Sequence, residues 1–350
     1  MHPSRRLARA ALGLCLGFAL NAAAAPQSEP ESVPATEPQA DAPVREDAVV
    51  LETLVVSGKM PGPGMWKVSR DGHTMWILGT LQPVPKRMEW ESDEVAERIA
   101  AAEVILMPAV FNFDLGMGRF RQLMLLPSLL GARKNPEKGR LQDQVSAEDY
   151  ARWLVLKDRY MGRSRKVEGF RPVFAASELN GEALEASGLR HRALVSPLID
   201  KLAREHDIPL ERPRLTLRIE NPRQAIREFR EARIDDAQCF HQMLEHLEND
   251  LVNMRIRANA WARGDLLTLR EVSFTDPSQA CVDAVFQSRF AKEQGIDNLA
   301  ERLDALWLEN AEKLIAAHAT SFAALPMDKL LGENGQLAAL AARGYRVDEP

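Results

Sequence analysis

The sequence lacks the short motifs that identify several large enzyme classes. It has no Gly-x-Ser-x-Gly nucleophile elbow, no phosphate-binding P-loop and no glycine-rich dinucleotide fingerprint. Its seven histidines give no clear metal-binding pattern either. His241 and Glu245 can share a helix face, but His246 lies five residues from His241 and points elsewhere. We therefore interpret this group as a solvated helix face rather than a metal site.

Long apolar runs and an excess of positive charge are also absent. Beyond Ala25 no apolar run approaches the length of about 20 residues that a bilayer span requires, so we expect no transmembrane segment in the mature chain. The whole chain has 45 basic and 50 acidic residues, and without residues 1–25 it has 42 against 50, a net charge of −8. This balance argues against a nucleic-acid partner. The Arg-rich stretches 158–171 and 223–233 interleave with acids and are interpreted as solvated faces.

Residues 1–25 have the order of a cleavable signal peptide. Three arginines precede a short apolar run at 10–20, and Ala22–Ala25 supply small residues for cleavage. The apolar run is too short to span a bilayer, which takes about 20 residues. A buried first helix, the alternative, does not explain the flanking arginines and alanines. We therefore expect a periplasmic or secreted protein.

Residues 26–64 are expected to form a leader between the signal peptide and a globular domain at 65–350. Residues 26 to 46 are rich in Pro, Glu, Ala and Ser, a composition typical of disorder. A β-branched run at 49–58 predicts a short strand, which Pro61–Gly64 ends. Two interpretations stay open. This strand is an edge strand of the following domain, or it is offered to a partner by β-augmentation.

The globular region shows the mixed signals of an α+β fold. Met65–Ser69 and Thr74–Gly79 alternate around Asp71-Gly72, which predicts a hairpin. From residue 222 to 318 the pattern is almost entirely helical. The apolar, Met-rich stretch 115–130 is expected to cover the core as a loop or helix. Further signals are strands at 104–107 and 214–219, and a helix capped by Ser146 with Asp149 as its box-like partner.

The two cysteines outside the signal peptide, Cys239 and Cys281, are expected to pair. Cys239 lies near the start of a helical pattern that runs to Arg263, and Gly264-Asp265 follows as a turn before a second helical pattern. The midpoint of the two cysteines falls close to this turn, so an antiparallel helical hairpin would place the sulfurs level. Level cysteines in an oxidising compartment usually form a disulfide. Two separate buried thiols are the alternative.

Several weak motifs occur in a fixed order along residues 65–350. A Trp-Lys strand at Met65–Val68 is followed by Trp76–Leu81, which ends in Gly-Thr-Leu, and the chain closes with Leu331–Leu337 and Gly344–Val347. This order resembles the TraB/GumN family, whose second strand ends in Gly-Thr/Ser-x-His. Three internal stretches fit in the same order: Leu198–Ala203, Ile219-Glu220 with Gln224, and Ala260–Asp265.

The resemblance implies a mixed β-sheet flanked by helices. The family includes the animal Tiki proteins, which act as metal-dependent peptidases outside the cell. Their chemistry is tied to two Gly-x-x-His motifs and to an acidic residue on the strand after the first helix. Neutral imidazoles and a carboxylate can hold a divalent cation, which activates water.

This chain departs from the family pattern at the positions of the metal ligands. Gln82 stands where the first histidine is expected, and Pro108 stands where the acid is expected. In the second motif Pro326 replaces glycine and Lys329 replaces histidine. An amide, a proline ring and an ammonium group are poor partners for a metal ion. The candidate binding residues of this altered cleft are Gly79, Thr80, Gln82, Pro108, Glu220 and Lys329.

Three functional hypotheses follow. The first is a pseudoenzyme without metal or cofactor that binds a small ligand or an envelope protein in the altered cleft. The second is a metal-independent hydrolase or peptidase with Glu220 as base and Lys329 as electrostatic stabiliser. The third is an envelope interaction protein that acts through residues 49–58. Loss of the ligand positions favours the first over the second, and we expect Glu220 to pair with Lys329 or another basic residue.

Overall fold

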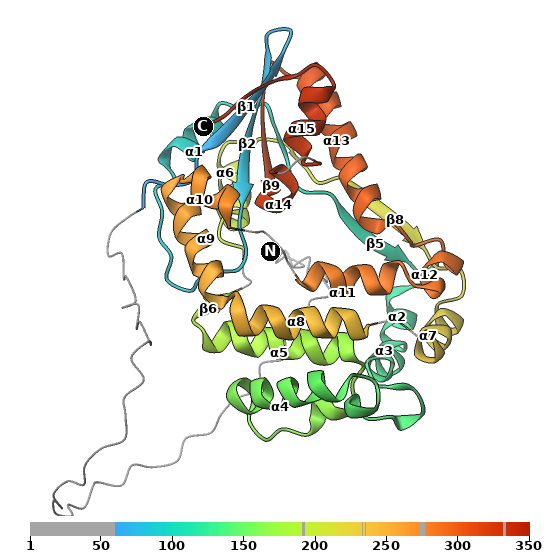
Figure 1. Cartoon of the computed structure of the whole chain (residues 1–350). Helices are drawn as coiled ribbons and strands as arrows, with labels where there is room; N and C mark the ends of the chain where they lie inside the picture. Colours follow the sequence, from blue (N-terminus) through green and yellow to red (C-terminus); the bar gives the residue numbers. More distant parts are fainter. Residues whose placement is uncertain (1–59, 191–192, 233, 235, 273–276, 332–333) are drawn as a thin grey trace, which may run out of the picture. The chain divides into compact units, whose positions relative to one another are not determined.

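The computed structural model describes residues 60–350 except 191–192, 233, 235, 273–276 and 332–333 (Figure 1). The expected signal peptide, and nearly all of the expected leader with its strand at 49–58, lie outside the described residues. Met60 is buried in the core and forms a bridge with Trp90, upstream of Met65, the expected start of the domain.

A mixed six-stranded sheet forms the centre of the domain. Its strand order is β10-β1-β2-β9-β4-β7. The expected hairpin is confirmed: β1 and β2 pair in antiparallel fashion, and Asp71 and Gly72 both have positive φ in the turn between them. β2, β9, β4 and β7 run parallel to one another. The strand bounds are β1 Met65–Arg70, β2 His73–Thr80, β4 Val104–Leu106, β7 Leu210–Glu211, β9 Thr320–Pro326 and β10 Arg346–Asp348.

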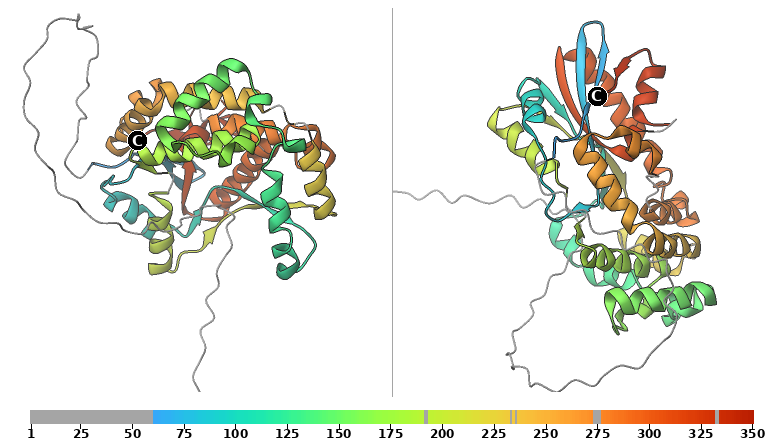
Figure 2. Two further views of the ribbon diagram at one scale, coloured as in Figure 1. Left: turned by 90° about the horizontal axis from the view of Figure 1, so that it is seen from below. Right: turned by 60° about the vertical axis from the view of Figure 1, so that its left-hand side comes forward.

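The middle of this sheet is apolar on both faces because helices cover both. Met75, Ile77, Ile105 and Phe322 are completely buried, as expected for strands between two helical layers. α1 and α6 contact each other on one side of the sheet, whereas α13 and α15 lie on the other (Figure 2). The helix bounds are α1 Asp93–Ala100, α6 Ser196–Glu205, α13 Leu299–Ala317 and α15 Gln336–Ala342. The expected α+β class is confirmed.

A second core is entirely helical. It joins α4, α5, α8 and α11 around buried side chains such as Trp153, Leu179 and Phe240. The expected disulfide is confirmed, since Cys239 of α8 is bonded to Cys281 of α11 across a Cα–Cα distance of 4.8 Å. The bounds are α4 Ala147–Met161, α5 Pro172–Ala186, α8 Ala237–Asn249 and α11 Pro277–Phe286.

The helical hairpin that motivated the disulfide is more complex than expected. The helical pattern from Cys239 to Arg263 is divided at Asp250 into α8 and α9. α9 and α10 contact each other at the Gly264 turn, and α11 then packs back on α8. The cysteines therefore meet between α8 and α11, not across a two-helix hairpin. The bounds are α9 Leu251–Arg263 and α10 Leu266–Glu271.

A third group of elements surrounds a two-stranded parallel sheet of β5 and β8. Leu217 and Ile219 pack with Leu299 at the start of α13. The stretch 115–130 forms α2 and α3 beside α7 (Figure 1), but the expectation that it covers the core is wrong, because most of its large apolar side chains are exposed. The bounds are β5 Val110–Asp114, β8 Arg214–Arg218, α2 Arg119–Leu123, α3 Leu126–Ala132, α7 Pro222–Glu231 and α12 Arg289–Glu293.

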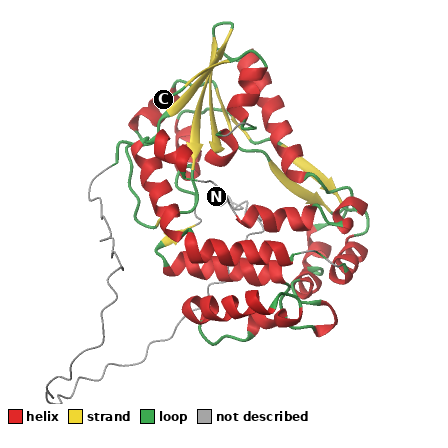
Figure 3. Cartoon of the chain, viewed as in Figure 1, coloured by secondary structure: helices red, strands yellow, loops and turns green. Residues whose placement is uncertain are grey.

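Short elements complete the domain (Figure 3). β3 and β6 form a small antiparallel pair, and α14 follows β9 directly. Their bounds, with those of the 3-10 helices, are β3 Val84–Pro85, β6 Leu189–Arg190, α14 Met327–Leu330, η1 Pro136–Lys138, η2 Leu141–Asp143 and η3 Lys166–Gly169.

Candidate functional site

Most of the candidate residues gather where the parallel strands end. Gly79 and Thr80 end β2 and lie opposite Leu325 and Pro326 of β9 in the strand register. Pro108 follows the end of β4, the next strand along the sheet, and Lys329 lies in α14 just after β9. Carboxyl ends of parallel strands commonly carry the binding site of such sheets. We call Gly79, Thr80, Gln82, Pro108 and Lys329 the strand-end site.

Gly79 is covered by neighbouring side chains. A Cβ atom at this position would lie 2.0 Å from the sulfur of Met327 and 3.2 Å from the ring of Trp66. Met327 and Trp66 are both buried. The carbonyl oxygen of Gly79 accepts a hydrogen bond of 2.7 Å from the indole nitrogen of Trp261. The absence of a side chain thus admits the Met327 thioether, which occupies the space beside the strand end.

Lys329 forms an ion pair with a residue that no sequence motif identifies. Its Nζ lies 3.0 Å from Oδ2 of Asp304 in α13, and both side chains are partly exposed. Of the pairings expected for Glu220, with Lys329 or with another basic residue, the one with Lys329 is not found in the described part of the chain, because Asp304 of α13 pairs with Lys329 instead. An ammonium group held in this way is an unsuitable metal ligand, since it must lose its proton to coordinate.

The remaining side chains of the strand-end site do not form a metal centre. Gln82 is exposed, and Pro108 is half-buried without a ligand atom in its side chain. In the part of the chain that the structure describes, no three His, Cys, Asp or Glu side chains form a group that could hold a metal ion. The donor set at the strand ends, an amide, a proline and a paired ammonium, does not fit the metal that the family resemblance implies.

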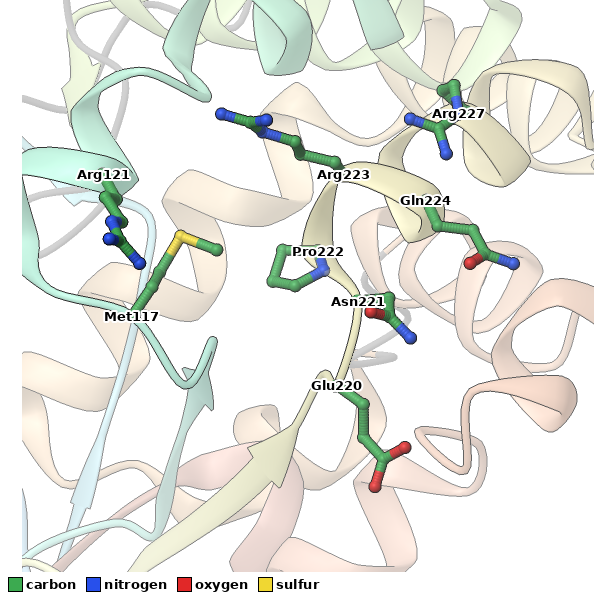
Figure 4. A pocket seen from close by; sticks show the side chains of 8 residues that line it. All are labelled: Met117, Arg121, Glu220, Asn221, Pro222, Arg223, Gln224 and Arg227. Atoms are coloured by element: carbon green, nitrogen blue, oxygen red, sulfur yellow. The ribbon is translucent and has the colours of Figure 1, made fainter.

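Glu220 lies apart from the strand-end site, in a concave pocket beside α7 with a volume of about 520 Å³. Figure 4 shows Met117 and Arg121 on one side of this surface and the six labelled residues of Glu220 to Gln224 and Arg227 on the other. Glu220 closely follows β8, and Asn221 and Pro222 begin α7. We call this surface the Glu220 pocket, with the lining residues Met117, Arg121, Glu220, Asn221, Pro222, Arg223, Gln224 and Arg227.

The charges of the Glu220 pocket are mainly positive. Three of its side chains are arginines and one is a carboxylate, and all four are exposed to solvent. The interpretation of 223–233 as a solvated face misses Arg223 and Arg227 as pocket residues. Arg223 and Arg227 are four residues apart, and this spacing could have predicted that both lie on one face of a helix. Arg121 comes from α2, and no sequence pattern connects it with α7.

A buried arginine holds α7 in place. The guanidinium of Arg171 donates hydrogen bonds to the carbonyl oxygens of Phe229, Arg230 and Ala232, at 2.9, 2.8 and 3.0 Å. These carbonyls end α7, where a positive charge is favourable. Burial lowers the pKa of Arg171, an effect that nearby Asp236 opposes. The hydrogen bonds of Arg171 therefore fix the C-terminal end of α7, the helix that carries Arg223 and Arg227.

α13 connects the two sites. Leu299 and Leu303 of α13 belong to the same apolar cluster as Ile219, the residue before Glu220. The next residue along α13 is Asp304, which pairs with Lys329. The apolar neighbour of Ile219 and the ion-pair partner of Lys329 are therefore adjacent residues of one helix, although Glu220 and Lys329 have separate surroundings.

Comparison with known proteins gives one match. No curated protein and no solved structure is similar enough to the chain to count as a match. Among the described residues, no helix has both the length and the apolar composition that a membrane crossing requires. The model of the TraB/PrgY/gumN family matches residues 64–349, which is most of the chain and the whole of the mixed sheet and its helices. The chain therefore belongs to the TraB/PrgY/gumN family.

Proposed function

We propose that this family member is a non-catalytic protein of the cell envelope that binds a small ligand. The main support for this proposal is the Lys329–Asp304 ion pair. Lys329 stands at the position of the second family histidine, and its ammonium group is paired with a carboxylate instead of being free to change its role. Gln82 and Pro108 stand at the other two positions where the family resemblance implies a metal ligand, and neither side chain is a good ligand for a transition metal.

The Glu220 pocket is the binding surface in this proposal. Arg121, Arg223 and Arg227 supply positive charge and planar donors that suit a carboxylate or a phosphate. Glu220 lies at the other end of the pocket and can receive an ammonium group. We therefore propose an anionic or zwitterionic small ligand.

We further propose that the chain is exported. Residues 1–25 act as the signal peptide, 26–64 as the leader and 65–350 as the domain, and the Cys239–Cys281 disulfide is consistent with an oxidising compartment. Expression in a Gram-negative host followed by intact-mass measurement of the exported protein tests this. Loss of about 25 residues supports export by cleavage, and an uncleaved leader on exported protein contradicts it.

Elemental analysis together with a peptidase assay tests the non-catalytic assignment. We expect no stoichiometric zinc, manganese or cobalt in the purified protein and no peptidase activity, with or without a chelator. One metal ion per chain and activity that a chelator abolishes would refute the proposal. Activity that resists chelation and is lost in Glu220→Gln would instead favour the metal-independent hydrolase.

Calorimetric titration tests the binding surface, with inorganic phosphate and glutamate as probes. We expect the double variant Arg223→Gln, Arg227→Gln to raise the Kd of a bound probe by about tenfold or more. Arg204→Gln on α6, which is exposed and outside the pocket, is the matched control and should bind as the wild type does. If neither probe binds, or if both variants bind equally, the Glu220 pocket is not the site.

A further inference from the structure

Helices α2 and α3 present an unusual run of exposed apolar side chains. Phe120 is 77% exposed and Met124 is 63% exposed, whereas Leu125 between the two helices is the buried anchor at 3%. Single exposed apolar residues are common, but a contiguous group marks an interaction surface. We call this group the apolar segment, and its exposed members are Phe120, Leu123, Met124, Leu126, Leu129 and Leu130.

Within residues 115–134, which contain the apolar segment, the charged residues are all basic, although Arg133 is paired with Glu178. From Leu115 to Lys134 the sequence has four basic residues and no acidic residue, in a chain whose net charge is −5. Arg121 lies within the segment, Lys134 follows it, and both are exposed. Arg230 of α7 is also exposed, and its guanidinium lies against Gly131 of α3. The apolar side chains are thus bordered by cations from two parts of the fold, and α7 also carries the acidic residues Glu228 and Glu231.

This combination of apolar and basic side chains indicates what covers the surface. A second copy of the chain, packed symmetrically on it, would bring one positively charged border against another, which is unfavourable. An anionic bilayer surface accepts both features, because the apolar side chains enter the boundary between headgroups and acyl chains while the cations contact the headgroups. α2 and α3 have five and seven residues, so they are too short to span a bilayer.

We propose that the apolar segment docks the domain on the surface of an anionic lipid bilayer. Phe120, Met124 and the four leucines enter the interface, while Arg121, Lys134 and Arg230 contact the acidic headgroups. This docking shares Arg121 with the Glu220 pocket, whereas Lys134, Arg230 and the apolar side chains lie outside that pocket.

Vesicle sedimentation tests the proposal with the chain from residue 26 onward, which keeps the whole compact unit Ser57–Pro350. One set of vesicles is phosphatidylcholine alone, and the other is an equal mixture of phosphatidylcholine and phosphatidylglycerol. We expect binding to the anionic vesicles to be about tenfold tighter than to the neutral ones and to weaken as salt is added. Equal binding to both sets, or no binding to either, would overturn the proposal.

Variants locate the contact. Phe120→Ser combined with Met124→Ser should reduce binding to the anionic vesicles by about tenfold or more. Leu267→Ser is the matched control, because Leu267 is 73% exposed on α10, outside the apolar segment, and its loss should leave binding unchanged. Lys134→Gln combined with Arg230→Gln tests the cations without altering a residue of the Glu220 pocket, and should weaken the salt dependence.

Two further readouts keep these results interpretable. All substituted positions are exposed, so circular dichroism spectra and Tm should stay as in the wild type.

Light scattering measures the molar mass of the protein in solution. A dimer that Phe120→Ser with Met124→Ser dissociates would show that a second copy covers the apolar segment, and the membrane proposal would then be wrong. Equal vesicle binding by this double variant and Leu267→Ser would likewise rule it out.

Discussion

The indole nitrogen of Trp261 donates a hydrogen bond of 2.7 Å to the carbonyl oxygen of Gly79, across 182 residues of sequence. Trp261 lies in α9, and Gly79 is the next-to-last residue of β2. Trp90 packs edge-on against the same indole, with ring centroids 5.4 Å apart. α9 is thereby fixed on the end of the strand that carries the first family motif.

Trp261→Phe should lower the free energy of unfolding by about 1–3 kcal/mol, because it leaves the buried Gly79 carbonyl without its donor. Urea denaturation measures the change. Trp307→Phe is the matched control: Trp261 and Trp307 are each 1% exposed, but the Trp307 indole nitrogen has no hydrogen-bond partner among the described residues. Equal losses in the two variants would mean that ring volume, and not the hydrogen bond, determines the effect.

Gly79→Ala should destabilise the protein by about 1–3 kcal/mol, because the new Cβ collides with the Met327 sulfur. Combining it with Met327→Ala should cost less than the sum of the two single changes, since the truncated side chain makes room for the methyl group. A double-mutant cycle of urea denaturation measures this coupling. Purely additive losses would show that Met327 does not occupy the space beside Gly79.

Replacing Cys239 and Cys281 together by serine should lower the free energy of unfolding by about 2–4 kcal/mol, because the bridge constrains the unfolded chain between residues separated by 42 positions. Reductant should destabilise the wild type by a similar amount and leave the double variant unaffected. Mass mapping without reductant should recover the two cysteines in one linked peptide pair. Two freely alkylated thiols in protein made under oxidising conditions would contradict this.

Asp149 should make the stability of the helical core sensitive to acid. Burial acts to raise the pKa of its carboxyl group, but hydrogen bonds from His241 and Ser146, with the charges of His241 and Arg152, outweigh burial and lower it. A carboxylate whose pKa is lowered by folding stabilises the protein above its unfolded pKa of about 4, and this contribution is lost as the pH falls through the lowered value.

Asp149→Asn should therefore reduce stability at neutral pH and lose less stability than the wild type as the pH falls from about 5 to about 2. Chemical denaturation across this range measures both effects. Asp158→Asn, at an exposed position of the same helix, is the control and should follow the wild-type profile. Parallel profiles for the wild type and Asp149→Asn would contradict the role of Asp149.

Local features could be predicted from the sequence because they depend on neighbouring residues. The Asp71-Gly72 turn needs positive φ, which these residue types adopt readily, and the strands on either side alternate accordingly. Ser146 accepts a hydrogen bond from the backbone of Asp149, as its position before the helix indicates. The disulfide was also predicted, although the helices that bring its cysteines together are α8 and α11.

The composition of the sites could not be predicted because it depends on contacts distant in sequence. Asp304 reaches Lys329 only because α13 packs along the sheet, and nothing near Lys329 in the sequence indicates it. Arg121 meets the α7 arginines through the placement of α2 beside α7. The apolar stretch 115–130 has the composition of a core segment, so its exposure became visible only in the fold.

The position of β9 has a consequence for how the chain folds. β9 lies between β2 and β4, which precede it by more than half the length of the chain and have no hydrogen bonds to each other in the sheet. Until residues 320–326 pair with them, β2 and β4 expose unpaired edges that favour aggregation. Pairings between such distant segments also fold slowly, since a long loop must close first. The sheet is therefore completed from the carboxyl end, and a chain cut short before β9 would be an open-edged fragment rather than a smaller domain.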